Sequence, residues 1–364
     1  MIFLKWESIK GLEEFKMTKM KAARWYAAKD IRVEEIEVPE VGAGQIKVAI
    51  KYTGICGSDL HEYLAGPIFI PANEKHPISG VQAPLTMGHE FCGEVVEIGE
   101  GVENVKVGDR VAIEPIIAEH GLVGDYNLDP NLNFVGLAAN GGFAEFCVVD
   151  GELAHIIPDS LSYEQAALTE PSAVALYAVR QSALKAGDTA AVFGCGPIGL
   201  LVIESLRAAG ASKIYAVELS EERQAKAEEL GAIVVRPEEG ESTVEAIQRL
   251  TDGGVDVSYE VTGVPVVLQQ ALQSVHKAGE CMVVSIWEKE AAIDPNELAI
   301  GEKALKGIIA YRHIFPNVLE LMEKGYYSAD KLVTKKIKVD DIVEEGFEEL
   351  TRDKSQVKIL VSPK

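Results

Sequence analysis

The sequence of 364 residues contains little cysteine and no closely spaced cysteine pair. Its five cysteines lie far apart, at Cys56, Cys92, Cys147, Cys195 and Cys281. A disulfide framework normally uses an even number of cysteines at short spacings, so this pattern indicates reduced thiols. Cys195 lies inside a glycine-rich loop, where we expect a small filler side chain.

A long apolar run is also missing, because no stretch approaches the ~20 residues that a bilayer-spanning helix needs. The amino terminus opens Met-Ile-Phe-Leu, but Lys5, Glu7 and Lys10 soon interrupt it. Residues 1–19 therefore lack the apolar centre of a secretion signal. We interpret them as an amino-terminal extension and expect a cytoplasmic protein.

Blocks of basic residues are absent as well. The chain has 35 Lys and Arg against 57 Asp and Glu, for a formal net charge of -22. Such a surface repels phosphate backbones and anionic lipids, so we predict neither a nucleic-acid nor a membrane partner. With 47% hydrophobic residues, the chain has the ordinary composition of a folded protein and the length of roughly two domains.

The first part of the chain, from Lys21 to about Ile157, shows short alternating strands between glycine turns. In residues 45–52 (Gln-Ile-Lys-Val-Ala-Ile-Lys-Tyr), apolar side chains occupy every second position. Residues 93–99 and 108–111 continue the pattern. Alternation with period two is typical of half-buried strands, so this part is predicted to be a compact β-rich domain.

From Thr189 onward, strands alternate with helices, which indicates a parallel sheet covered by helices. Strands are expected at 190–193, 213–217, 233–235, 255–261, 281–286 and 306–310, and helices at 198–209 and after the N-cap Ser220. Six such strands make a doubly wound sheet. The last fifty residues, with a helix at 313–325 and strands at 335–339 and 357–361, do not extend the alternation and are expected to return to the first domain.

A glycine motif, Gly194-Cys195-Gly196-Pro197-Ile198-Gly199, follows the first of these strands and opens a helix. Its first glycine permits a tight turn, its second lets the backbone approach a pyrophosphate, and Gly199 lets helix and strand pack closely. The amino end of the following helix attracts the anion. In this context the motif predicts a dinucleotide-binding site.

The second strand of the sheet ends at Glu218, nineteen residues after Gly199. An acid at this point can accept hydrogen bonds from the adenosine ribose and repels a 2′-phosphate, so NAD is favoured over NADP. Arg223 either covers the adenine or is an ordinary exposed helical arginine, and the sequence leaves both open.

Candidate metal ligands occur in three separate segments: Gly54-Ile55-Cys56-Gly57-Ser58-Asp59-Leu60-His61, Gly88-His89-Glu90 and Glu170-Pro171-Ser172. Each is unremarkable alone, because a lone cysteine is usually a core filler and a histidine at a turn is usually satisfied locally. Together they supply a thiolate, an imidazole and two carboxylates. That combination suits a catalytic zinc with one open position.

These segments, with Met87-Gly88-His89-Glu90 and Phe193 to Leu200, follow one another as in the zinc-dependent medium-chain alcohol and polyol dehydrogenases, which the chain resembles from Met20 onward. The resemblance implies an α/β protein with a GroES-like β-rich catalytic domain (20–173, completed by 314–364). It also implies a Rossmann nucleotide-binding domain (174–313) with a doubly wound parallel sheet.

The same resemblance assigns roles to single residues. It implies Cys56, His89 and Glu170 as zinc ligands, Glu90 as an acid that can approach the metal, and Asp59 as the acid that holds His89. Whether Glu90 or Glu170 holds the resting metal stays open. Ser58 is implied as the acceptor of the substrate proton and His61 as the distal relay, against the alternatives of a turn serine and a surface histidine. The segments flanking the nicotinamide are implied at Val261, Thr262, Ser285, Ile286 and Trp287.

One departure from the family concerns a second, structural zinc. Many relatives carry four closely spaced cysteines just after the position of Glu114, whereas residues 115–146 contain none. We therefore expect one catalytic Zn²⁺ and no structural zinc. Tyr311 and Arg312, near the expected return to the catalytic domain, either shape the pocket or form a surface pair.

The implied activity is NAD-dependent interconversion of a secondary alcohol or vicinal diol and its ketone, with (R,R)-butane-2,3-diol and acetoin as the expected small-molecule pair. Sorbitol, another polyol or threonine is the alternative substrate. An NADH-binding protein without catalysis is the alternative of another class, although the intact ligand set argues against it. A homodimer or homotetramer is expected by the same resemblance.

Overall fold

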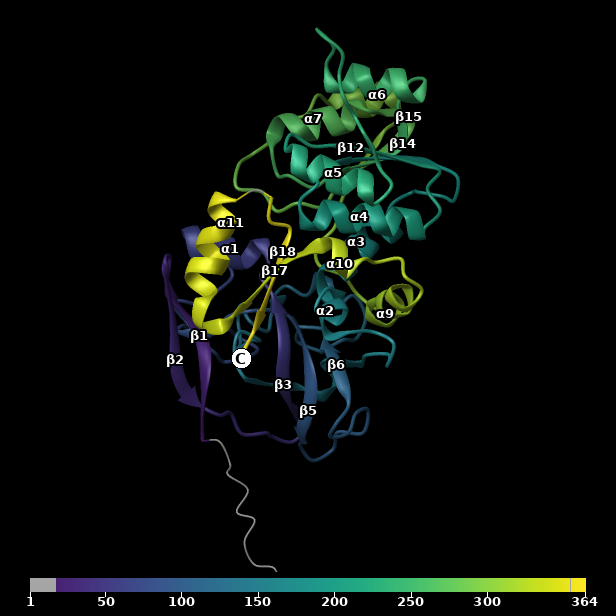
Figure 1. Ribbon diagram of the computed structural model, residues 1–364. Helices are drawn as coiled ribbons and strands as arrows, with labels where there is room; N and C mark the ends of the chain where they lie inside the picture. The colour runs from purple at the N-terminus through teal and green to yellow at the C-terminus, as the bar shows by residue number, and fades with distance from the viewer. Residues whose placement is uncertain (1–17, 354) are drawn as a thin grey trace, which may run out of the picture.

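The computed structural model describes residues 18–353 and 355–364, which form a β-rich region and an α/β region (Figure 1). Of the expected extension, residues 1–17 lie outside the described residues. Lys19, which that extension included, is instead the first residue of strand β1. Its backbone pairs with β2 from Lys19 onward, which is why the strand begins there.

The β-rich region is built from a seven-stranded, a three-stranded and a two-stranded sheet. Its strands are β1 (Lys19–Ala27), β2 (Asp30–Glu37), β3 (Gln45–Gly54), β4 (Leu85–Thr86), β5 (Glu90–Ile98), β6 (Arg110–Ile113), β7 (Ile116–Ile117), β8 (Asn133–Phe134), β9 (Phe146–Asp150), β10 (Ala154–Ile156), β17 (Val333–Lys338) and β18 (Lys358–Ser362). Its helices are α1 (Gly57–Ala65), α10 (Ala329–Leu332) and α11 (Glu349–Arg352), the last preceded by a π-helical segment at Ile342–Glu348. The alternation in 45–52 thus corresponds to β3, as predicted.

The α/β region contains one six-stranded parallel sheet with the order β13-β12-β11-β14-β15-β16. The strands are β11 (Thr189–Phe193), β12 (Lys213–Val217), β13 (Ile233–Val234), β14 (Val255–Glu260), β15 (Val275–Val283) and β16 (Ala304–Gly307). The helices are α4 (Pro197–Ala208), α5 (Glu221–Glu229), α6 (Thr243–Thr251), α7 (Pro265–Gln273) and α8 (Pro295–Gly301), while α2 (Tyr163–Ala166), α3 (Thr169–Gln181) and α9 (Phe315–Glu323) connect the two regions. This order is that of a doubly wound dinucleotide-binding sheet, so the α/β prediction is confirmed.

Some predicted bounds were wrong by a few residues. The strand expected at 281–286 is the end of the longer strand β15, which already stops at Val283. The last strand, expected at 306–310, is β16 at Ala304–Gly307, so residues 308–310 follow the strand instead of ending it. Residues 284–286 and 308–310 are therefore loop segments at the carboxyl end of the parallel sheet, the edge at which such sheets bind ligands.

The carboxyl-terminal segment joins the sheet of the β-rich region. Strand β18 pairs antiparallel with β3, with Leu360 opposite Gly54, and the Ile55 backbone N–H donates to the carbonyl of Ile359. This pairing brings Lys358, from the end of the chain, beside the turn that follows β3. In Figure 1 the yellow β17 and β18 lie between the purple strands and the teal helices.

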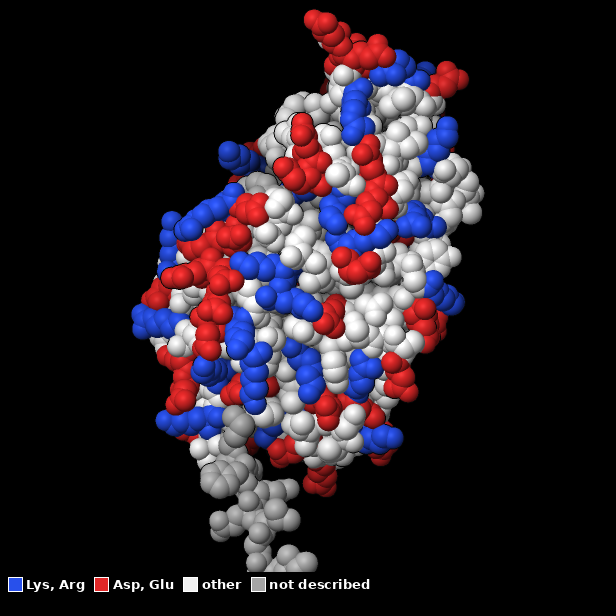
Figure 2. Space-filling view, in the orientation of Figure 1, with Lys and Arg blue, Asp and Glu red and all other residues white. Residues whose placement is uncertain are grey.

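The surface matches the acidic composition. On the face shown in Figure 2, lysines and arginines are interspersed with aspartates and glutamates. Among the described residues, no helix is long and apolar enough to cross a bilayer. All five cysteines are unpaired, as the spacing predicted, and Cys195 is fully buried.

Candidate active site

A cavity of about 320 Å³ lies where the two regions meet. From the β-rich side and α3 it is lined by Cys56, Ser58, His61, His89 and Glu170, and from the α/β side by Gly196, Pro197, Ile198, Gly199, Val261, Thr262, Ser285 and Ile286. We call this cavity the cleft. A larger cavity of about 620 Å³ in the β-rich region is lined by none of the predicted site residues. The cleft is the candidate site because it joins the predicted metal ligands to the glycine loop.

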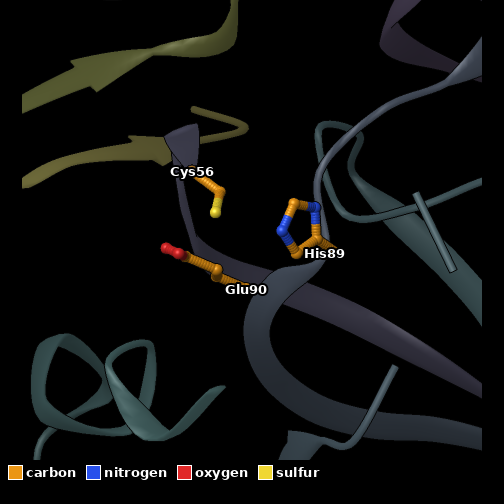
Figure 3. A group of neighbouring side chains, drawn as sticks. All are labelled: Cys56, His89 and Glu90. Atoms are coloured by element: carbon orange, nitrogen blue, oxygen red, sulfur yellow. The ribbon is translucent and has the colours of Figure 1, made fainter. Parts of the chain in front are cut away.

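Cys56, His89 and Glu90 form a cluster whose ligand atoms all lie within 4.8 Å of one another (Figure 3). Cys56 precedes the first residue of α1, and Glu90 opens β5 opposite Gly54 of β3. Gly88 has a φ of 95°, and a Cβ there would lie 2.8 Å from Phe143 and Thr53. Only glycine permits this turn without strain, and the turn presents His89 to the cluster.

Asp59 supports two members of this cluster. Its Oδ2 accepts a hydrogen bond of 3.0 Å from the Cys56 backbone N–H, and its Oδ1 lies 3.4 Å from His89 Nδ1. Burial disfavours the charged imidazole, but the charges of Asp59 and Cys56 outweigh it and hold the pKa of His89 well above its ordinary value. With Nδ1 directed at Asp59, Nε2 is the nitrogen left for a ligand, as in carboxylate-supported metal-binding histidines.

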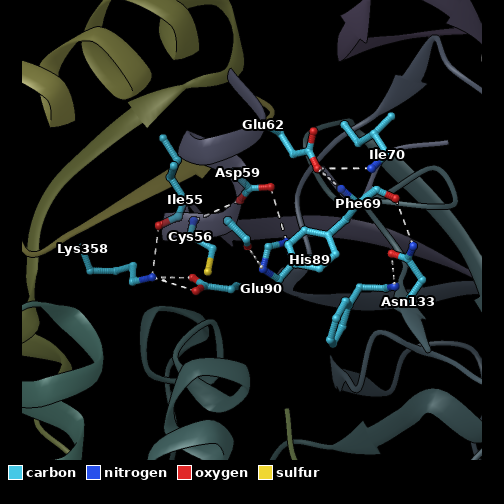
Figure 4. Close-up of polar contacts among 12 residues, drawn as sticks. Ile55, Cys56, Asp59, Glu62, Phe69, Ile70, His89, Glu90, Asn133 and Lys358 are labelled. Carbon is cyan, nitrogen blue, oxygen red and sulfur yellow. Dashed lines mark hydrogen bonds and ion pairs between the residues drawn. The ribbon is translucent and has the colours of Figure 1, made fainter. Parts of the chain in front are cut away.

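Lys358 is the partner of Glu90, and sequence reasoning missed it. Its Nζ lies 2.8 Å and 2.7 Å from the two carboxylate oxygens of Glu90 and 3.1 Å from the Ile55 carbonyl oxygen (Figure 4). Both side chains are buried. Burial lowers and the Glu90 charge raises the pKa of Lys358, with a net rise, so the charged ammonium form of Lys358 is favoured. No local pattern reveals it, because 268 positions separate the two residues.

Glu170 lies in the first turn of α3 and lines the cleft, but it is not among the three residues whose ligand atoms lie within 4.8 Å of one another. In the described chain, Glu90 is the carboxylate grouped with Cys56 and His89, so which of the two acids holds a bound metal stays a prediction. Burial and the charge of Glu90 raise the pKa of Glu170 to about 7, while His89 and the Tyr311 hydroxyl oppose the rise. A cation in the cluster would favour the ionised carboxylate.

The donor set fits a zinc ion. Cysteine sulfur and imidazole nitrogen are ligands that select zinc, and a nearby carboxylate completes a three-ligand site with an open position. His89 Nδ1 and Asp59 Oδ1 are buried and have no hydrogen-bond partner among the described residues, so they have only each other. This is the arrangement expected of a support for a metal-bound imidazole.

Ser58 and His61, which the resemblance implied as a proton relay, both line the cleft. Ser58 Oγ lies 3.2 Å from His89 Nε2, so the hydroxyl lies beside the cluster. His61 is 38% exposed, and its Nδ1 lies 3.9 Å from Glu288 of the α/β region. The serine is thus at the inner end of the cleft and the histidine at its mouth.

The glycine loop has the geometry that its sequence predicted. Gly194 has a φ of 96°, which permits the turn after β11. A Cβ on Gly199 would lie 1.9 Å from the Gly194 carbonyl oxygen, so α4 can approach the strand only with glycine there. A Cβ on Gly196 would meet nothing within 4 Å, and its backbone lines the open cleft at the start of α4.

Glu218 directly follows β12, and its carboxylate connects the glycine loop to the next turn. Oε2 accepts from the Cys195 N–H at 2.8 Å, and Oε1 accepts from the N–H groups of Leu219 and Ser220 at 2.7 and 3.0 Å. Ser220 caps α5 as predicted, since its Oγ accepts from the Arg223 N–H. Arg223 is partly exposed in the first turn of α5.

Two turns from the parallel sheet form the wall opposite the cluster. They contribute Val261 and Thr262 after β14, and Ser285 and Ile286 after β15. Trp287, also predicted to flank the nicotinamide, does not line the cleft and packs against the core between sheet and helices. Glu260, which the sequence analysis did not single out, accepts hydrogen bonds from both turns.

The other walls are mainly apolar. Phe69, Phe134 and Leu137 line the cleft from the β-rich side. The buried carboxylate of Glu62 fixes the loop that carries Phe69 by accepting from the backbone N–H groups of residues 68, 69 and 70 (Figure 4). Neither Tyr311 nor Arg312 lines the cleft: Tyr311 is fully buried behind Glu170, and Arg312 pairs with Asp125.

Two family models match the chain in the order of its two regions. Residues 42–159 match the alcohol dehydrogenase GroES-like domain, and residues 197–324 match the zinc-binding dehydrogenase domain. The fold and its cleft are those of a zinc-dependent oxidoreductase that uses a nicotinamide cofactor, and the predicted GroES-like and Rossmann pairing is confirmed.

Particular relatives narrow this class. The (R,R)-butanediol dehydrogenase of Bacillus subtilis is 66% identical over 94% of this chain and 100% of its own length. The (R,R)-butanediol dehydrogenase of Neisseria gonorrhoeae is 42% identical over 94% of this chain and 99% of its own. The crystal structure of the B. subtilis 2R,3R-butanediol dehydrogenase superposes with a TM-score of 0.93 over 95% of this chain and 100% of that one. The chain therefore belongs to the zinc-binding alcohol dehydrogenase family.

Proposed function

We propose that the protein interconverts (R,R)-butane-2,3-diol and acetoin, using NAD and one zinc ion held at Cys56, His89 and a carboxylate. The observation that carries the proposal is the cleft of about 320 Å³, which is lined by Cys56 and His89 on one side and by the glycine loop on the other. The 66% identity to a butanediol dehydrogenase supports the substrate.

We take Glu170 as the third ligand and Glu90 as an acid that approaches the metal. Both oxygens of Glu90 are held by Lys358, whereas no Lys or Arg ion pair holds Glu170 in the described part of the chain. When bound, zinc supplies Lewis-acid polarisation of the reacting oxygen. The single-zinc proposal rests on the absence of cysteines from residues 115–146.

The chain's own residues then handle the proton. In the oxidative direction, bound NAD would take a hydride from the hydroxyl-bearing carbon, and the hydroxyl would lose its proton. Ser58, beside His89, would take that proton while releasing its own hydroxyl hydrogen into the cleft, and His61 at the mouth of the cleft would pass a proton on to solvent. The turns carrying Thr262 and Ser285 support the ring at the opposite wall.

The apolar walls favour a short diol over a hexitol. Phe69, Phe134, Leu137 and Ile309 offer contacts for methyl groups but no partners for additional hydroxyls. A sorbitol chain would bury hydroxyl groups without hydrogen bonds in such a cleft, which costs binding energy. Sorbitol and threonine remain the alternative substrates.

The test is a substrate panel. With NADH and acetoin, and with NAD and the diol, we expect turnover, while sorbitol and threonine should react far more slowly. Faster turnover of sorbitol than of the diol would show that the substrate is a polyol. NADH binding without turnover of any substrate would show that the protein binds NADH but is not an enzyme.

We further propose a homodimer or homotetramer. Strand β16 is the outer strand of the six-stranded sheet and leaves one edge without a strand partner among the described residues, and such edges favour association. Light scattering on the purified protein should give a mass two or four times that of the chain. A monomer would refute the proposal. The cytoplasmic location stays a prediction.

A further inference from the structure

Glu260 is a fully buried carboxylate whose hydrogen bonds all come from the two turns of the cleft wall. Oε1 accepts from the backbone N–H groups of Thr262 at 2.7 Å and Gly263 at 3.1 Å, and from the Thr262 hydroxyl. Oε2 accepts from the Ser285 hydroxyl and, at 3.3 Å, from Gly263. No Lys or Arg in the described chain forms an ion pair with it.

These bonds fix the polarity of the Ser285 hydroxyl. A serine hydroxyl has one hydrogen and two lone pairs, and here Glu260 takes the hydrogen. Toward the cleft, Ser285 can therefore only accept a hydrogen bond. The Thr262 hydroxyl also gives its hydrogen to Glu260, but it already accepts from the Val264 N–H.

Ser285 lines the same cleft as the glycine loop and the metal cluster. A group that binds there next to an acceptor-only hydroxyl, with a buried carboxylate behind it, should be a neutral donor. A carboxylate in that place would face lone pairs and a like charge. The carboxamide N–H₂ of a nicotinamide fits this requirement.

We propose that Glu260 is a positioning residue that makes Ser285 an acceptor-only hydroxyl, through which the protein selects the carboxamide of nicotinamide over the carboxylate of a nicotinic acid dinucleotide. The inference rests on the proposed function, because it needs the cofactor ring in the cleft. The choice between the carboxamide and the carboxylate would then depend on Glu260 and Ser285, which belong neither to the glycine loop nor to the metal ligands.

Glu260→Gln tests the inference with almost no change of shape. The glutamine oxygen can still accept from Thr262 and Gly263, but its N–H₂ group faces Ser285 and donates to Oγ. The serine hydrogen is then free to donate into the cleft, which favours a carboxylate. Ser285→Ala removes the acceptor altogether.

The measurement is the dissociation constant of the zinc-loaded, full-length protein for NAD and for nicotinic acid adenine dinucleotide, each by displacement of fluorescent NADH. We expect the wild type to prefer NAD by about tenfold or more, and Glu260→Gln and Ser285→Ala each to lower that ratio by about tenfold. The double variant should match Ser285→Ala, because Glu260 acts through Ser285.

Glu280→Gln is the matched control. Glu280 is also a buried carboxylate of the same sheet, and it accepts a hydrogen bond of 2.6 Å from the Ala183 backbone N–H. It does not line the cleft. Its ratio should equal that of the wild type. A purely structural role for Glu260 would weaken both dinucleotides equally and leave the ratio unchanged, which would overturn the inference.

Equal wild-type affinity for the two dinucleotides would also overturn it. Turnover of acetoin by the wild type, measured in parallel, reports on the proposed function independently. An active wild type with an unchanged ratio in both variants therefore refutes only the inference.

Discussion

The glycine loop and the metal cluster face each other across one cleft, yet they are built in opposite ways. The loop and its acid occupy one continuous segment, from Gly194 to Glu218, and local backbone geometry determines how they lie. The cluster gathers Cys56, His89 and Glu90 with Lys358, whose ammonium pairs with Glu90 across 268 positions of the sequence. The nucleotide side thus depends on local turns, and the metal side depends on long-range sheet pairing.

Because the two sides are built separately, we predict that removing a metal ligand abolishes turnover but leaves nucleotide binding intact. Cys56→Ser or His89→Ala should lower turnover of acetoin by roughly a thousandfold or more, because the site loses its metal. NADH affinity, measured by fluorescence titration, should change little. Cys147→Ser, at a buried thiol away from the cleft, is the control. Turnover retained by either ligand variant in metal-free buffer would contradict the account.

Breaking the ion pair between Lys358 and Glu90 should lower the stability of the protein more than its affinity for the cofactor. Lys358→Met leaves the buried carboxylate of Glu90 without its cation, so we expect the free energy of unfolding to fall by about 3–5 kcal/mol. The double variant with Glu90→Gln should recover much of that loss. Chemical denaturation measures both. A Lys358→Met protein as stable as the wild type would show that the pair is not buried in solution.

A buried carboxyl group at the junction between the two regions should make the free energy of unfolding depend on pH. Glu204 of α4 is buried and accepts from the Ser328 N–H at 2.9 Å, and burial raises its pKa to about 7. The folded protein then binds a proton that the unfolded chain releases near pH 4.5, so this contribution is full below pH 4.5 and is lost as pH rises to about 7.

Glu204→Gln should remove this dependence. Relative to the wild type, the variant should gain stability between pH 5 and pH 8, by about 3 kcal/mol at most. Urea unfolding at the two pH values measures the gain. Parallel stability profiles for the two proteins would contradict the assigned pKa.

The smallest predicted effect concerns the choice between NAD and NADP. Glu218→Ala removes the carboxylate that would repel a 2′-phosphate, so the preference for NADH over NADPH, as a ratio of kcat/KM, should fall by about tenfold. Glu221→Gln, at an exposed acid of the next helix, should keep the wild-type ratio. An unchanged NADH-to-NADPH ratio in Glu218→Ala would show that other residues determine the preference for NAD.

What the sequence could predict follows the same division. The alternation of strands and helices, the glycine loop, the acid at Glu218 and the cap at Ser220 all depend on neighbours within a few tens of residues, and periodicity and glycine spacing reveal such features. The predicted members of the cleft wall were also found, except Trp287, because the strand before it ends earlier than expected.

The remaining site residues carry no local signal. Lys358 reaches Glu90 only because β18 pairs with β3, and Glu62 and Glu260 are acids whose roles are set by loops that fold back on them. Nor does sequence spacing decide between Glu90 and Glu170, since their distances from Cys56 and His89 depend on how α3 packs against β5. Only three-dimensional structure supplies these relations.

The central claim, that Cys56, His89 and one carboxylate share a single zinc ion beside the nicotinamide, is tested most directly by anomalous diffraction at the zinc absorption edge from crystals grown with NADH. We predict one anomalous peak per chain, in bonding contact with Cys56 Sγ, His89 Nε2 and Glu170. A second peak in residues 115–146 would contradict the single ion, and a peak away from Cys56 and His89 would contradict the site.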